Sequence, residues 1–138
     1  MKSRTLTIAI AVALLAVTAG YAQSKAQLIA DIPFEFTVGQ KVLPAGEYTV
    51  NPSAAPGVLV IGGRDASAFT VTIPSSTNSG NVPDSKLVFS RYGNTYFLSQ
   101  VWNAASQRGY RLPKSKTERE MARNAGRTEL ASVRATVR

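Results

Sequence analysis

The acid, base and nucleophilic residue types of this chain limit the chemistry that it can perform. Its 138 residues include no histidine and no cysteine. Catalysis by Ser–His–Asp or Cys–His groups is therefore excluded. A metal site would need carboxylates alone, which favour Ca²⁺ or Mg²⁺, and no Asp-x-Asp-x-Asp-Gly pattern occurs. We therefore expect no catalytic residue, no metal site and no cofactor.

Two glutamates offer a remaining hydrolytic option. Glu35 and Glu47 fall on consecutive predicted strands. Glycoside hydrolysis by two carboxyl groups requires them to lie about 5–10 Å apart, and pairing of those strands could bring them together. Solvated acids on a strand face explain both residues more simply, so a carboxylate-only hydrolase is the weaker alternative.

Aromatic residues gather around a predicted hairpin and could bind a ligand. Tyr92, Tyr96 and Trp102 could stack against sugar rings or another small ligand, with Arg91 beside them. Arg91 faces Tyr96 in the predicted register, which suits either a cation–π pair or contact with a ligand. The alternative, which we favour, is core packing, because aromatic side chains bury a large apolar area. These four residues are the candidate ligand-binding residues.

Positive charge is concentrated in the C-terminal quarter of a chain whose formal net charge is +8. In this region Arg119, Arg123 and Arg127 recur every four residues, which would align them on one helix face. Such a stripe could bind an anionic cell-envelope surface or an acidic polysaccharide. Nucleic acid is not expected as a partner outside the cytoplasm. The alternative is a solvated helix face with ion pairs such as Lys116–Glu120.

The N-terminus has the pattern of a secretory signal peptide. Two basic residues precede an apolar run over residues 6–19, and small residues follow at Gly20 and Ala22. Such a pattern is typical of a cleaved signal, whereas a membrane anchor needs roughly 20 apolar residues. We predict a signal peptide over residues 1–22, with cleavage after Ala26 as the alternative. The mature chain would then be exported to the periplasm or the exterior, without a transmembrane segment.

The pattern of apolar residues predicts a series of short strands. Alternation or continuous apolar runs mark residues 28–38, 46–50, 58–63 and 67–74. Pro33 interrupts the first segment, which places it at a sheet edge or makes it irregular there. Gly46 ends a predicted type I turn. Residues 74–85 form a polar loop rich in Ser, Asn, Gly and Pro.

A hairpin over residues 86–102 is the clearest local prediction. Gly93 and Asn94 separate two runs of β-forming residues, as in a type II′ turn. This turn sets a register that pairs Tyr92 with Thr95, Arg91 with Tyr96, Phe89 with Leu98 and Leu87 with Gln100. Trp102 then shares the face of Leu87 and Phe89, whereas Val101 shares the face of Val88 and Tyr92.

The C-terminal segment predicts one helix and a flexible end. Ser115 and Glu118 match a capping box, and Gly126 suits a helix stop, so a helix is expected over residues 116–125. Residues 127–138 are polar and basic, which indicates a flexible tail. The domain plan is a β domain over residues 23–112, a helical segment over 113–126 and this tail. The fold class is all-β: a small antiparallel sandwich or barrel of six or seven strands with one short C-terminal helix.

Several blocks of the sequence resemble a family of small secreted, uncharacterised bacterial proteins. The blocks are "IPFEFTVGQKVLPAGEYTV", "GVLVIGG", "KLVFSRYGNTYFLSQVW" and "LPKSKTERE", in this order, within residues 28–122. The resemblance implies an exported β-rich domain with a short C-terminal helical segment. It implies no activity, cofactor or catalytic residue.

The sequence favours an exported, non-enzymatic β domain that binds a partner or belongs to the cell envelope. The alternative is a module that binds carbohydrate or another small ligand through the hairpin aromatics. The oligomeric state is left open by the sequence.

Overall fold

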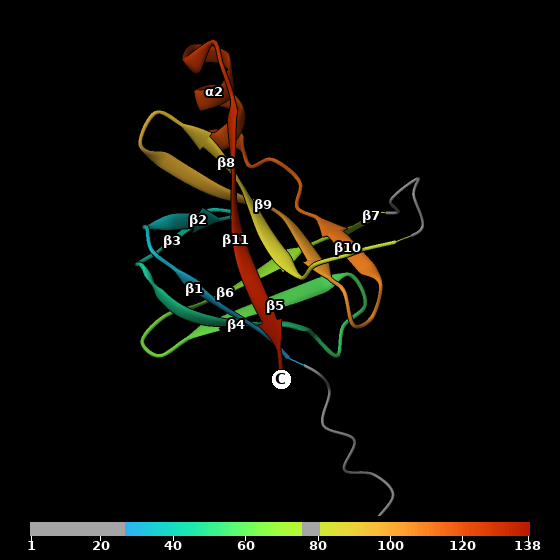
Figure 1. Ribbon diagram of the computed structural model, residues 1–138. Coiled ribbons are helices and arrows are strands. Elements are labelled where there is room, and N and C mark those ends of the chain that lie inside the picture. Colours follow the sequence, from blue (N-terminus) through green and yellow to red (C-terminus); the bar gives the residue numbers. More distant parts are fainter. Residues whose placement is uncertain (1–26, 76–80) are drawn as a thin grey trace, which may run out of the picture.

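The computed structural model describes residues 27–75 and 81–138, and the eleven strands of this part of the chain form one sheet that nearly closes into a barrel (Figure 1). The all-β class with a short C-terminal helix, α2, is confirmed. The expected six or seven strands are too few, because several strands span only three or four residues and give weak sequence patterns. The predicted signal peptide over residues 1–22, with both cleavage positions, lies outside the described residues.

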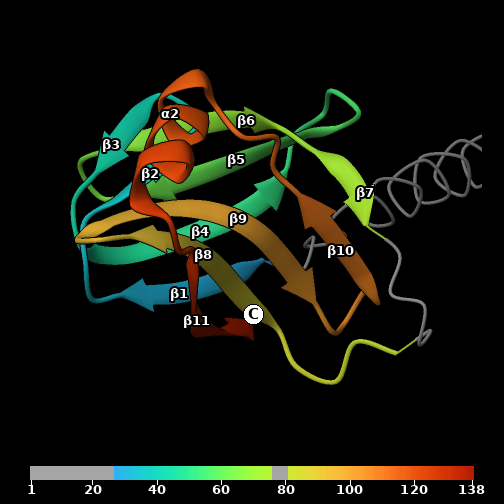
Figure 2. The same cartoon turned by 90° about the horizontal axis from the view of Figure 1, so that it is seen from above.

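The elements follow one another along the chain with short connections. They are β1 Leu28–Ile32, β2 Phe36–Val38, β3 Lys41–Leu43, β4 Gly46–Pro52, β5 Val58–Gly63, β6 Ser67–Val71, β7 Ile73–Ser75, β8 Lys86–Tyr92, β9 Thr95–Asn103, β10 Arg108–Arg111, α2 Lys116–Ala125 and β11 Glu129–Val137. Neighbouring strands run in the order β3-β2-β9-β8-β11-β1-β4-β5-β6, and β10 pairs with both β9 and β7 (Figure 2). Because β7 follows β6 along the chain, its pairing with β10 helps to bring the two end strands of this order, β3 and β6, together.

The segment predicted as one strand over residues 28–38 is two strands. β1 pairs with β4, and β2 pairs with β9, in parallel through Thr37 and Phe97. The break follows from Pro33, which has no N–H to give to a ladder. Ile32 before the break and Phe36 after it are each 1% exposed, so both strands contribute to the same core.

The predicted hairpin is confirmed at its turn and corrected further along. Gly93 has a φ of +63°, and Tyr92, Arg91 and Phe89 pair with Thr95, Tyr96 and Leu98 as expected. A bulge then leaves Ser99 without a partner on β8, so that Leu87 faces Val101 rather than Gln100. Because successive side chains point to opposite faces, this one-residue shift places Val101 in the core and moves Trp102 to the outer face.

The C-terminal segment is a strand of the barrel, and the predicted flexible tail is wrong. β11 pairs with β8 from Glu129 to Arg134 and with β1 from Ala135 to Val137. Ala131, Val133 and Ala135 point inward and pack on the core. Their small side chains, separated by polar and basic residues, give a weak apolar pattern, which explains why sequence reasoning missed the strand.

Helix α2 has the predicted bounds. The backbone N–H of Glu118 donates a 3.2 Å hydrogen bond to Oγ of the N-cap residue Ser115. Gly126 ends the helix with a φ of +65°, a left-handed conformation that glycine adopts without strain. The helix carries the chain from β10 back to the start of β11 (Figure 1).

Removal of residues 127–138 tests the closing role of β11. The shortened chain would leave the edges of β1 and β8 unpaired and uncover the core. We therefore expect the full chain to unfold in urea with a cooperative transition by circular dichroism, and the shortened chain to lack it. The control is Leu130→Ser, because Leu130 is 68% exposed on this strand; its free energy of unfolding should change by less than about 0.5 kcal/mol. An unchanged midpoint in the shortened chain would contradict the closing role.

Candidate functional site

Trp102 is held on the outer face of the barrel by a glycine on the next strand. Gly109 of β10 is its cross-strand partner, and a Cβ placed on Gly109 would overlap the indole ring. The indole Nε1–H donates a 3.0 Å hydrogen bond to Oε1 of Gln100. One side of the ring therefore lies against backbone and its polar edge is fixed, so the ring has a defined orientation before any ligand arrives.

A groove of about 310 Å³ lies beside Trp102. Its apolar part includes Val88 and Leu130, from the adjoining strands β8 and β11. Its polar part includes Asp84 and Gln100. Ligand sites commonly combine an apolar wall with a few convergent polar groups, and this groove has the size and composition to hold one small ring with hydroxyl substituents.

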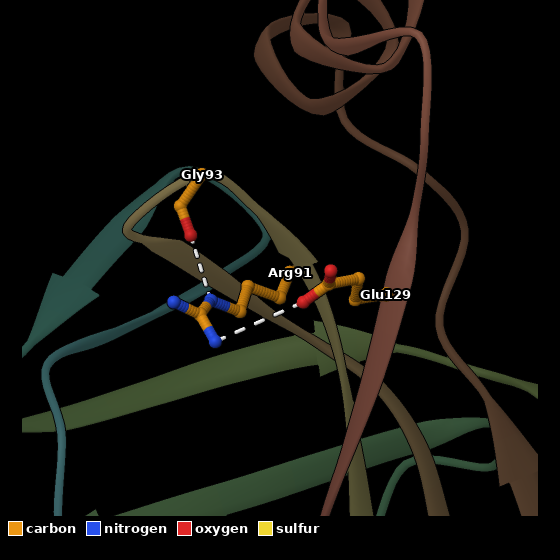
Figure 3. A network of polar contacts seen from close by, with 3 residues as sticks. All are labelled: Arg91, Gly93 and Glu129. Carbon is orange, nitrogen blue, oxygen red and sulfur yellow. Dashed lines mark hydrogen bonds and ion pairs between the residues drawn. The ribbon is translucent and has the colours of Figure 1, made fainter.

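Arg91 and Tyr96 meet as predicted, but both are engaged within the protein. The Arg91 Cζ atom lies 5.5 Å from the centroid of the Tyr96 ring, and that ring stacks on Phe34 at 3.8 Å. Arg91 Nε–H also donates to the carbonyl of Gly93 at 2.7 Å, and its Nη1 lies 3.8 Å from Oε2 of Glu129 (Figure 3). These contacts tie the hairpin to β11.

Tyr92 lies under α2 and faces a buried carboxyl group that sequence reasoning assigned only to capping. The Tyr92 hydroxyl donates a 3.1 Å hydrogen bond to Oε1 of Glu118. Both residues are 5% exposed. The backbone of Glu118 does take part in the cap at Ser115, whereas its side chain anchors the helix to β8. The partners are separated by 26 residues, and no local motif signals their contact.

Burial raises the pKa of Glu118 above its ordinary value of 4.5. The hydrogen bond from Tyr92 and the positive charge of Lys114 oppose this rise in the pKa. Loss of solvent dominates because a carboxylate inside a protein loses most of its hydration.

The four predicted ligand-binding residues therefore do not form a single groove. Arg91 and Tyr96 form one cluster, Tyr92 is covered by the helix, and Trp102 lines a groove that includes none of the other three. Sequence reasoning assumed an unbroken hairpin ladder, and the bulge at Ser99 places Trp102 on the opposite face from Tyr96.

The carboxylates assigned to hydrolysis have different surroundings. Glu47 lies directly across from Asp31 in the register of β4 and β1. It also lines a cavity of about 680 Å³ between two turns, to which Glu35 does not contribute. Within residues 27–75 and 81–138 there is no group of three or more side chains of His, Cys, Asp or Glu that could hold a metal ion.

The arginine stripe is exposed and lies partly outside the helix. Arg119 and Arg123 belong to α2, whereas Arg127 follows the stop at Gly126. Among the described residues none of the three forms an ion pair, and the alternative pair Lys116–Glu120 does not form. No helix in this part of the chain has the length and apolar character to cross a membrane.

Comparisons of the chain with protein-family models, with curated proteins and with solved structures gave no match. The resemblance of the sequence blocks to small secreted bacterial proteins therefore stays an expectation. Any functional assignment rests on the geometry of the described residues.

The buried Glu118 predicts a pH dependence of stability. Because its pKa is raised on folding, the folded state binds a proton more tightly than the unfolded state. The contribution of Glu118 to the free energy of unfolding is then greatest below pH 4.5. It falls as the pH rises through the raised pKa and is constant above it. Urea unfolding between pH 4 and 8 should show this fall, superimposed on the contributions of other groups.

The substitution Glu118→Gln isolates the effect because it keeps the shape and removes the proton equilibrium. The difference in unfolding free energy between wild type and this variant should change across the window above pH 4.5. Glu120→Gln is the matched control on the exposed side of the same helix. An equal pH profile for wild type and Glu118→Gln would show that the buried carboxyl group does not titrate differently on folding.

Proposed function

We propose that this chain is an exported, non-enzymatic binding domain and that it binds a carbohydrate or a similar small ligand in the groove beside Trp102. The observation that carries the proposal is the fixed indole ring. It is packed on Gly109 and oriented by Gln100, next to a cavity with both apolar and polar walls. A preorganised aromatic surface loses little side-chain entropy when a ligand stacks on it.

Two further observations support binding rather than catalysis. The chain has no histidine or cysteine, and Glu35 and Glu47 do not line a common cavity. Export rests on the N-terminal sequence pattern of residues 1–22, and the periplasm or the exterior is the expected location. The abundant ligands outside the cytoplasm include polysaccharides, whose sugar rings offer an apolar C–H face and a rim of hydroxyl groups.

Tryptophan fluorescence tests this proposal directly, because Trp102 is the only tryptophan of the chain. Neutral hexasaccharides of glucose and of N-acetylglucosamine are the probes. We expect a saturable change in emission with at least one of them, and iodide quenching that the bound sugar reduces. In calorimetry Trp102→Leu should weaken binding by about 2 kcal/mol or more, roughly 30-fold, as for other buried aromatic anchors.

The matched control is Tyr96→Phe. This ring belongs to the cluster of Phe34 and Arg91 and does not line the groove, so the substitution should leave sugar affinity unchanged. Emission that responds to none of the probes, together with equal calorimetric traces for wild type and Trp102→Leu, would argue against the groove as the binding site.

A second candidate function is attachment to an anionic envelope surface. The observation that favours it is the exposure of Arg119, Arg123 and Arg127 without ion pairs among the described residues. A basic side chain close to an anionic membrane contributes about 1 kcal/mol to binding. Three such residues would contribute roughly 3 kcal/mol, or about 100-fold in affinity.

A triple variant with Gln at these three positions tests the surface. Binding to phosphatidylcholine vesicles that contain phosphatidylglycerol, and to polygalacturonate, should fall by about 100-fold and should weaken with added salt in the wild type. The control variant carries Gln at Lys41, Arg64 and Arg111, which removes the same charge elsewhere. Equal losses in the two variants would indicate a general charge effect without a defined surface.

A further inference from the structure

An apolar patch covers the outer face of β5, β6 and the start of β7. Phe69, Val71 and Ile73 alternate along the chain, and they are 70%, 64% and 55% exposed. Beside them on β5 lie Val60 and Val58, the cross-strand partners of Phe69 and Val71, and both are partly exposed. Single exposed apolar side chains are common on protein surfaces, whereas a contiguous patch marks a site of interaction.

The part of the chain that forms this patch carries no charge. No Asp, Glu, Lys or Arg occurs in residues 48–63 or 67–83. A charged partner would therefore lose the hydration of its charge on this face and find no opposite charge to compensate. Helices and patches that lie on membranes usually add several basic residues around the apolar side chains, whereas here the turn between β5 and β6 holds Arg64 next to Asp65. The matching surface must itself be apolar and uncharged.

Strand β6 also lacks the features that usually keep exposed strands apart. It is the last strand in the sheet order, and among the described residues it pairs with β5 alone. Edge strands of natural proteins commonly contain lysine, proline or a bulge, which prevent association with another copy. The sequence of β6 is SAFTV, and its register with β5 has no shift. This edge of the molecule therefore carries nothing that excludes a second copy of the chain.

We propose that a second copy of this chain covers the patch, in a symmetric dimer with the outer faces of β5 and β6 packed against each other. In such a contact the same patch serves both partners, so an uncharged apolar surface meets its equal. Phe69 protrudes furthest and is the anchor near the twofold axis. The patch has only five apolar side chains per copy, which is fewer than the roughly 20–30 residues per side of a standard interface. The dimer is therefore weak and reversible.

This surface is distinct from the groove proposed for carbohydrate. None of the five patch residues lines that groove. Arg111 of β10 is the register partner of both Ile73 and Gln100, so one strand separates the end of the patch from the groove. The inference goes beyond the proposed function, and either surface can fail its test while the other passes.

Sedimentation equilibrium of the wild-type protein tests the dimer. We expect a monomer–dimer equilibrium with a dissociation constant of about 10–100 µM, as for other small, transient interfaces. Over the same concentrations the methyl NMR signals of Val58, Val60, Val71 and Ile73 should shift together. A protein that stays monomeric up to about 1 mM, or that associates without shifts at these four residues, would overturn the proposal.

Two lysine variants with matched exposure test the anchor. Phe69→Lys should weaken self-association by about 30-fold, as for other aromatic anchors. Leu130→Lys is the control, because Leu130 is equally exposed, at 68%, but lies on β11; it should change self-association by less than about twofold. Circular dichroism checks that both variants fold. Association that persists in Phe69→Lys, for instance through the apolar residues 6–19, would overturn the role of the patch.

A mixing experiment distinguishes a second copy from other occupants. Phe69→Lys and Phe69→Glu should each be monomeric, and an equal mixture of the two should associate at least about tenfold more tightly than either alone, because opposite charges then meet near the twofold axis. No gain on mixing would overturn the symmetric contact. Binding of the wild-type monomer to vesicles of phosphatidylcholine alone, lost in Phe69→Lys, would assign the patch to a membrane and overturn the dimer.

Discussion

The pairing of the last strand with the first is the interaction on which the rest of the structure depends. β11 lies between β1 and β8, and at its end Gln27 and Arg138 exchange backbone hydrogen bonds of 2.8 and 2.9 Å. Without it the sheet would have two further open edges, which expose unpaired N–H and C=O groups. The barrel therefore closes only when both ends of the described chain are in place. Helix α2 leads from β10 into β11 and is fixed to β8 by the hydrogen bond between Tyr92 and Glu118.

The bulge in β9 decides which side chains of this strand face the core and which face the outside. An unbroken ladder would put Trp102 in the core and Val101 outside, because a one-residue slip exchanges the two faces of a strand. With Ser99 lacking a partner on β8, Val101 lies in the core and Trp102 lines the outer groove. Gly109 then makes room for the indole ring in the same way that Gly63 makes room for its cross-strand partner Tyr48. The candidate groove therefore depends on one bulged residue.

Local signals in the sequence predicted the local structure well. The bounds of α2, the turn at Gly93 and the first register pairs follow from capping, glycine and alternation, all of which act over a few residues. The bulge at Ser99 has no residue type that announces it. β11 was missed because its inward residues are small, and the contact of Glu118 with Tyr92 was missed because its partners are distant in sequence.

The absence of cysteine gives hydrogen bonds a larger structural role at the turn between β9 and β10. A chain without disulfides depends on packing and hydrogen bonding. Gln107 Nε2–H donates to the carbonyl of Val82 at 3.0 Å, and Gln107 Oε1 accepts from the N–H of Val82 at 2.8 Å. Gln107 forms this pair with a φ of +53°, which is uncommon for a residue other than glycine. The two hydrogen bonds fix the turn to the segment before β8, so the position of the end of β9 that carries Trp102 depends on side-chain hydrogen bonds rather than on a covalent cross-link.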